Sequence, residues 1–204
     1  MSGATIKPVS WIGSSYKDFR EFPDPVQDSM GYALYQAQIG LKHGSAKPRK
    51  GYGGAGVLEI VADRGPGIDP AAAQGSRGRL QGAACKRKSI MKKDPDTPIK
   101  RGTKNVFADL GFPDAETHLL KAGLVTRIQG VITAQELTQV AAAKRMGLSQ
   151  PDVSRLLNGQ FRDVSVERLM RLLTRLGCDV DITIRSHGKA AAPRDTIRLL
   201  AVSV

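Results

Sequence analysis

The stretch LTQVAAAKRMGLSQPDVSRLLNG, residues 137–159, has the residue pattern of two short helices joined by a tight turn. Thr138 and Ser149 are N-cap residue types, because a side-chain hydroxyl accepts a hydrogen bond from an unpaired amide one turn on. Gly147 suits the left-handed conformation at the end of the first helix, and Gly159 ends the second. The sequence therefore predicts helices after Thr138 and after Ser149.

The helical period predicts which side chains of these two helices face inward. The inward set is Val140, Ala143 and Met146 in the first helix and Val153, Leu156 and Leu157 in the second. The second helix then presents Gln150, Ser154, Arg155 and Asn158 outward. Glutamine pairs bidentately with adenine and arginine with guanine in the major groove, so this face predicts a helix-turn-helix that binds DNA. A solvated helix face remains the alternative interpretation.

The candidate DNA contacts fall into two groups. We expect Gln150, Ser154 and Arg155 to touch bases, and we expect the neighbouring polar residues to touch phosphates or flank the groove. The complete set of candidate DNA-binding residues is Thr138, Gln139, Ser149, Gln150, Ser154, Arg155, Asn158 and Arg162.

Two further helices and a strand are predicted around this segment. Pro113 and the acids after it open a helix, in which Leu120, Leu124, Ile128, Val131 and Ile132 should face the core, although Gly123 and Gly130 interrupt the pattern. Ser165 caps another helix, with an apolar stripe of Leu169, Leu172, Leu173 and Leu176. Residues 179–185 alternate between apolar and polar, which is typical of a half-buried strand.

Residues 91–189, and most clearly 104–189, resemble a HigA-like antitoxin of the XRE (Cro/C1-type) helix-turn-helix family. The matching segments are NVFADLG at 105–111, PDAE at 113–116, LTQ at 137–139, QPDVSRLLNG at 150–159 and SVERLM at 165–170. The resemblance implies a mainly α, Cro/C1 repressor-like domain with a C-terminal β-strand. It also implies a cytoplasmic, usually dimeric repressor that binds its own double-stranded operator DNA and neutralises a partner toxin.

The first 63 residues resemble the N-terminal part of a RelE/HigB-like, phage-derived toxin, a class of messenger-RNA endonucleases. The matching segments are KPVSWIG at 7–13, PDPVQ at 23–27, GYALYQAQ at 31–38 and GYGGAGVLEIV at 51–61. The residues themselves predict strands at 6–12 and 57–62 and helices at 14–22 and 25–39. The resemblance ends near residue 63, so we expect a small, incomplete α+β fragment that buries little apolar surface and has no ribonuclease activity.

These assignments predict four regions: a truncated toxin-like fragment at 1–63, a basic flexible linker at 64–104, the helix-turn-helix domain at 105–189 and a tail at 190–204. The chain carries 31 basic and 19 acidic residues and a net charge of +12. Residues 64–112 hold 11 of these basic and 4 of these acidic side chains. Most of the charge therefore lies outside the helix-turn-helix, where it either binds phosphate without reading sequence or forms a solvated run.

Other function classes have little support in the sequence. Cys85 and Cys178 suggest no disulfide framework, and His43, His118 and His187 lack the spacing of metal ligands. We therefore expect no metal, no cofactor and no enzymatic activity. The chain has no signal peptide and no long apolar run, so we expect no membrane partner and a cytoplasmic, nucleoid-associated protein.

The function predicted from the sequence is that of a repressor and antitoxin of a type II toxin–antitoxin module. Such a protein would repress its own operon as a homodimer and neutralise a RelE/HigB-like toxin. Two alternatives remain open: a toxin–antitoxin fusion that retains endonuclease activity, and a toxin-capturing protein that does not bind the operator.

Overall fold

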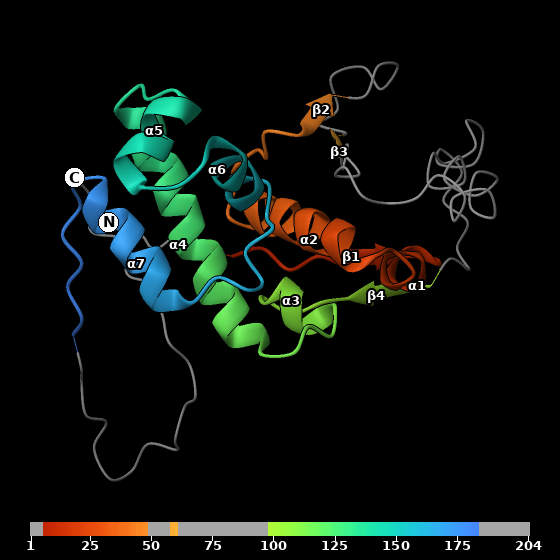
Figure 1. Ribbon diagram of the computed structural model, residues 1–204. Helices are drawn as coiled ribbons and strands as arrows, with labels where there is room; N and C mark the ends of the chain where they lie inside the picture. The colour runs from red at the N-terminus through yellow and green to blue at the C-terminus, as the bar shows by residue number, and fades with distance from the viewer. Residues whose placement is uncertain (1–5, 49–57, 61–97, 184–204) are drawn as a thin grey trace, which may run out of the picture.

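A computed structural model describes residues 6–48, 58–60 and 98–183 of the chain (Figure 1). Within these residues the fold is mainly helical, with four short strands. The long helix α4 (Ala115–Ala134) is central and packs against α7 (Val166–Arg175), α6 (Gln150–Leu157) and α3 (Val106–Asp109). Helix α5 (Gln139–Met146) contacts α6 and α7. The helix-turn-helix pair α5–α6 therefore rests on α4 and α7.

The helix caps expected from the sequence are confirmed. The Thr138 hydroxyl accepts a hydrogen bond from the Ala141 amide at 3.2 Å. The Ser149 and Ser165 hydroxyls cap α6 and α7 in the same way, at 3.3 and 3.2 Å from the amide three residues on. Gly147 ends α5 with a φ of +66°. Helix α4 runs unbroken through Gly123 and Gly130, because burial of Leu124, Val125 and Ile128 between them holds it in place.

The N-terminal part of the chain forms helices α1 (Ser15–Arg20) and α2 (Asp24–Gln38). Strand β1 (Ser10–Ile12) pairs antiparallel with β4 (Ile99–Arg101), with Trp11 opposite Lys100. Strand β2 (Ala46–Pro48) pairs antiparallel with β3 (Leu58–Ile60). The helices expected at 14–22 and 25–39 are thus present. The strand expected at 6–12 is shorter than predicted, and the strand expected at 57–62 is present over its described residues, 58–60.

Helix α2 belongs to the same hydrophobic core as the helix-turn-helix. It packs beside α4 (Figure 1). The ring of Tyr32 packs edge-on against that of Phe161 at 5.3 Å between centroids. His118 of α4 lies between Phe107 and Phe161, at 4.5 and 5.0 Å from their ring centroids. The expectation that the N-terminal fragment buries little apolar surface is therefore wrong for α2, because the helix-turn-helix half supplies the apolar surface that α2 lacks by itself.

Three other expectations need correction. Val140 is 68% exposed, because at 3.6 residues per turn it lies about 120° from Met146 around α5. The expected strand at 179–185 does not form over its described residues, 179–183, since none of the described chain pairs with it. The expected linker 64–104 lies mostly outside the described residues, but its end forms β4.

Candidate nucleic-acid interface

The outward face of α6 and the start of α5 carry the expected polar residues. Val153 and Leu156 are buried, and this fixes which side of α6 faces solvent. The exposed members of the expected set are Thr138, Gln139, Ser149, Gln150, Arg155 and Asn158, and Ser154 is half-buried. The structure therefore brings seven of the eight candidate residues onto the α5–α6 pair.

Gln150 and Gln139 are joined at the start of the two helices. The Nε2 of Gln150 donates a hydrogen bond to Oε1 of Gln139 at 2.8 Å. A glutamine amide has two N–H donors and one carbonyl acceptor, so Gln150 keeps one donor and its acceptor for another partner. Gln139 thus fixes the orientation of the Gln150 amide at the first residue of α6.

Asp152 lies between two side chains of the same helix. Its Oδ2 accepts a hydrogen bond from the Ser149 hydroxyl at 2.5 Å, and its Oδ1 accepts one from Nη2 of Arg155 at 2.5 Å. These hydrogen bonds, first from Ser149 and then from Arg155, lower the pKa of the Asp152 carboxyl. Asp152 therefore carries a full negative charge at neutral pH on a helix whose other outward groups suit DNA.

Arg162, the eighth candidate, lies against α2. Its Nε and Nη2 donate to Oδ1 of Asp28 at 3.1 and 2.8 Å, and its Nη1 donates to Oδ2 of Asp24 at 2.9 Å. Asp28 is buried, and this burial raises the pKa of its carboxyl although Arg162 lowers it. Arg162 is committed to these carboxylates, so a phosphate contact would have to compete with two ion pairs.

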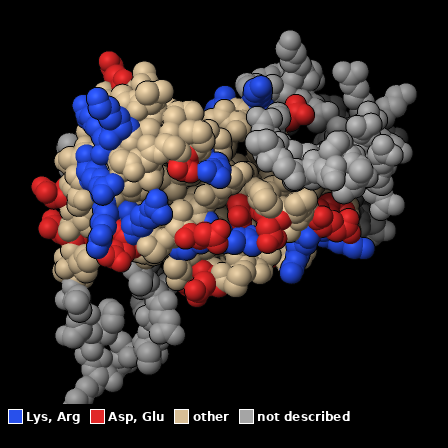
Figure 2. All heavy atoms as spheres, in the orientation of Figure 1, with Lys and Arg blue, Asp and Glu red and all other residues tan. Residues whose placement is uncertain are grey.

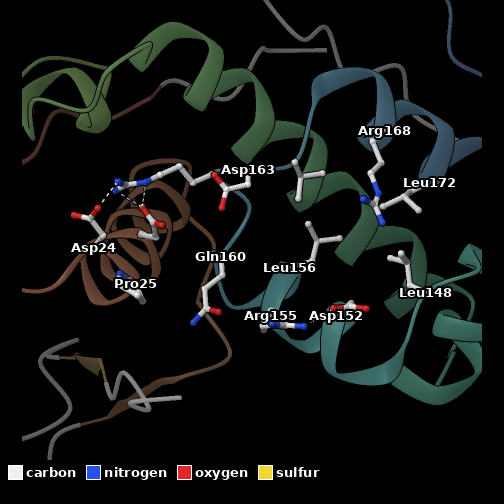
Figure 3. A pocket seen from close by; sticks show the side chains of 13 residues that line it. Asp24, Pro25, Leu148, Asp152, Arg155, Leu156, Gln160, Asp163, Arg168 and Leu172 are labelled. Atoms are coloured by element: carbon white, nitrogen blue, oxygen red, sulfur yellow. Dashed lines mark hydrogen bonds and ion pairs between the residues drawn. The ribbon is translucent and has the colours of Figure 1, made fainter. Parts of the chain in front are cut away.

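A groove of about 550 Å³ runs between α6 and α7 and reaches the start of α2 (Figure 3). Leu148, Leu156 and Leu172 form part of its lining. Arg168 extends from α7 toward the groove, and Arg155 and Asp152 lie across from it (Figure 3). Arg168 was not among the expected contacts. The sequence pattern does indicate that Arg168 faces outward, since Arg168 lies off the stripe of buried leucines in α7.

A column of basic side chains runs along one face of the molecule over α5 and α7 (Figure 2). The exposed cations of these two helices are Lys144, Arg145, Arg168, Arg171 and Arg175. Arg171 is paired with Glu167 at 2.6 Å, and Arg175 donates to the Met146 carbonyl at 2.6 Å. The described helix-turn-helix part thus has a positive flank beside α6, which suits a polyanionic backbone. None of the described helices is long and apolar enough to cross a membrane.

Residues 106–185 match a family model described as a helix-turn-helix domain. A solved structure described as an XRE family transcriptional regulator is 42% identical in sequence to this chain, with a TM-score of 0.41. The match covers 44% of this chain and 100% of that chain. No curated protein matches the chain.

Proposed function

Because the chain belongs to the XRE family of helix-turn-helix proteins, we propose that it is a sequence-specific transcriptional repressor that inserts α6 into the major groove of its operator. The observation that carries this proposal is the hydrogen bond between Gln150 and Gln139. A solvated helix face has no need to fix an exposed amide, whereas base reading depends on such preorganisation.

The free atoms of Gln150 match an adenine. Adenine presents the N7 acceptor and the N6 donor in the major groove. Gln150 retains one N–H donor and its carbonyl acceptor, the complementary pair. Arg155 is 62% exposed and offers its guanidinium to the O6 and N7 acceptors of a guanine. Ser154 and Asn158 line the same helix and supply shorter polar contacts.

Phosphates would be held on both sides of α6. The start of α5 provides Thr138, Gln139 and the amides of its first turn on one side. Arg168 and Lys144, exposed cations of α7 and α5, provide charge on the other. Such contacts fix the register of the protein on the duplex without reading its sequence.

The test is selection of duplexes from a random library by the full chain, followed by affinity measurement at one salt concentration. We expect an enriched sequence motif, bound at least about a thousandfold more tightly than random DNA. The Arg155→Ala variant should lose about 1–3 kcal/mol on the selected duplex and little on random DNA. An equal loss on both duplexes would make Arg155 a phosphate contact. Absence of any enriched motif would overturn the proposal.

A toxin-neutralising role is the second candidate. What supports it is that α2, within a segment resembling a RelE/HigB-like toxin, packs against α3 and α4 of the same chain. The test is titration of the full chain with a RelE/HigB-like toxin, together with growth rescue on co-expression. Complex formation and rescue support the role, and failure of both overturns it while leaving the DNA-binding proposal intact.

We also propose that the repressor acts as a homodimer, as operators with two half-sites require. The stretch 179–183 supports this, because it alternates apolar and polar residues and Ile182 is 73% exposed. Sedimentation of the full chain tests it, and a monomer at the concentrations that saturate DNA would contradict it.

A further inference from the structure

Asp152 is an acid at the third position of the helix proposed to enter DNA. A carboxylate on such a surface is repelled by every phosphate near it, so it weakens binding to all sequences alike. Its side chain is 45% exposed. It is held in place all the same, because both its oxygens accept hydrogen bonds, one from Ser149 and one from Arg155.

The contact with Asp152 leaves Arg155 able to read a base. A guanidinium has five N–H donors in a rigid plane. Asp152 accepts a hydrogen bond from one of these donors, on Nη2. The Arg155 side chain donates no other hydrogen bond to the described residues. Four donors remain, and guanine needs two of them for its O6 and N7 atoms.

Ser149 anchors the other end of this arrangement. Its hydroxyl accepts from the Asp152 amide and donates to the Asp152 carboxylate, which ties the carboxylate to the capped first turn of α6. The carboxylate therefore has little freedom to move, and the guanidinium one turn on takes its direction from it. The chain of contacts runs from the N-cap to the tip of Arg155.

We propose that Asp152 is a positioning residue that gives Arg155 its base specificity, by holding the guanidinium in the orientation in which it pairs with guanine and away from the phosphates. This inference rests on the proposed function and deepens it. An arginine without such a partner can turn toward the DNA backbone, where every sequence offers the same phosphate oxygens as acceptors. Asp152 thus lowers affinity for all DNA and raises the discrimination between sequences.

Asp152→Asn is the informative change, because it keeps the size of the side chain and removes the charge. The change should then move two quantities in opposite directions, the affinity for random DNA and the preference for one base. We expect affinity for random DNA to rise severalfold, since one repulsive charge is gone. We expect the preference for a guanine over an adenine at the position read by Arg155 to fall from about tenfold or more to below about threefold.

The measurement is fluorescence anisotropy of the full chain with the selected duplex and with duplexes changed at each G·C pair in turn. The pair at which Arg155→Ala abolishes discrimination identifies the position read by Arg155. Asp152→Asn in the Arg155→Ala background should then leave the remaining discrimination unchanged, because the two residues act through one contact.

Asp163→Asn is the matched control. Asp163 is an exposed acid that lines the same groove, and the structure gives it no hydrogen bond with Arg155. It should raise affinity for random DNA through charge alone and leave base preference intact. Thermal unfolding of each variant shows whether the fold survives.

The outcomes separate the two proposals. If wild type shows no base preference at all, the proposed function is overturned and this inference with it. If wild type discriminates and Asp152→Asn discriminates equally well, only the inference is overturned. A variant that loses affinity for every duplex in parallel, while still folded, also overturns it, because Asp152 would then act on the helix and not on Arg155.

Discussion

Arg162 and Asp28 lie 134 positions apart in the chain and are joined by two hydrogen bonds, of 3.1 and 2.8 Å. Arg162 follows the proposed recognition helix α6 by a few residues, and Asp28 lies in the first half of α2. The contact therefore fixes the segment after α6 to the N-terminal part of the protein. The helix-turn-helix and α2 form one structural unit, and stability and DNA binding should respond together to changes at this contact.

Arg162→Met should destabilise the protein by about 2–3 kcal/mol at neutral pH. The variant leaves the Asp28 carboxylate buried without its cation, a change that costs about 3–5 kcal/mol in fully buried pairs, and Arg162 is 32% exposed. Urea unfolding measures the loss. Arg171→Met is the control, since Arg171 pairs with Glu167 on the surface at 74% exposure and should change stability by less than about 1 kcal/mol.

The penalty of Arg162→Met should shrink as the pH falls. Burial raises the pKa of Asp28 above its usual 3.8, so the folded state binds this proton more tightly than the unfolded state. Protonation therefore relieves the unpaired charge as the pH falls through the raised pKa, and the relief is complete below about 3.8. A penalty independent of pH would show that the Arg162 side chain stabilises the fold by packing alone.

His118 should make the wild-type protein less stable in acid. Burial, and then the charges of Lys121 and Arg162, lower the pKa of His118 from 6.5 to about 4. A lowered pKa in the folded state gives stability that is present above about 6.5 and is lost as the pH falls through about 4. The difference between these two pKa values corresponds to about 3 kcal/mol of folding stability. The measurement is the free energy of unfolding by urea at pH 7 and at pH 4.

His118→Leu is the matched variant. It removes a buried ring whose Nε2 has no hydrogen-bond partner among the described residues, so little is lost at neutral pH. The variant should lose less stability between pH 7 and pH 4 than wild type does. His43, whose pKa burial also lowers, is present in both proteins and cancels in the comparison. Equal acid sensitivity of the two proteins would rule out His118 as the cause.

Gly159→Ala should destabilise the protein more than Gly177→Ala does. Both glycines have a positive φ, +96° and +90°, so alanine is strained at both by about 1–2 kcal/mol. A Cβ on Gly159 would also lie 2.8 Å from Cβ of Tyr32 and 3.0 Å from the Asp28 carbonyl oxygen. A Cβ on Gly177 would meet none of the described residues within 4 Å, apart from its chain neighbours. The overlap should add about 1–3 kcal/mol. Equal losses in thermal unfolding would mean that α2 does not press on this turn in solution.

Gln150→Ala should lower affinity for the selected duplex by about 1–3 kcal/mol and leave random DNA nearly unaffected. Gln139→Ala should lose less discrimination at the same base pair, because Gln139 acts on that pair only through the Gln150 amide. A double-mutant cycle measures the coupling, which should exceed about 0.5 kcal/mol. Thr174→Ala, a change on the exposed face of α7, is the control. Additive losses would place the two glutamines in separate contacts.

The features that follow from local rules could be predicted from the sequence. The caps at Thr138, Ser149 and Ser165 and the end of α5 at Gly147 depend on atoms a few residues away, so the local pattern determines them. The buried leucines of α7 follow from the helical period for the same reason. The exposed face of α6 was therefore correctly anticipated, and the DNA contacts assigned to it remain a prediction.

The features that depend on distant segments could not be predicted. Arg162 looked like a phosphate contact because its acidic partners lie in α2. Strands β1 and β4 have three residues each, and the paired residues Ile12 and Ile99 lie 87 positions apart, so the local pattern is too short to reveal the partner. Val140 was misplaced for a different reason: three-residue spacing drifts around a helix, and eight residues are too few to correct it.

The long-range contacts of α2 also set the order in which the chain acquires its structure during synthesis. Tyr32 leaves the ribosome well before Phe161, and Asp28 precedes Arg162 by 134 residues. At about 5–20 residues per second, α2 waits on the order of 10 seconds for the surface that covers it. Throughout that interval its apolar face is open to chaperones and to other nascent chains, so the DNA-binding unit can be completed only after its last helices have been translated.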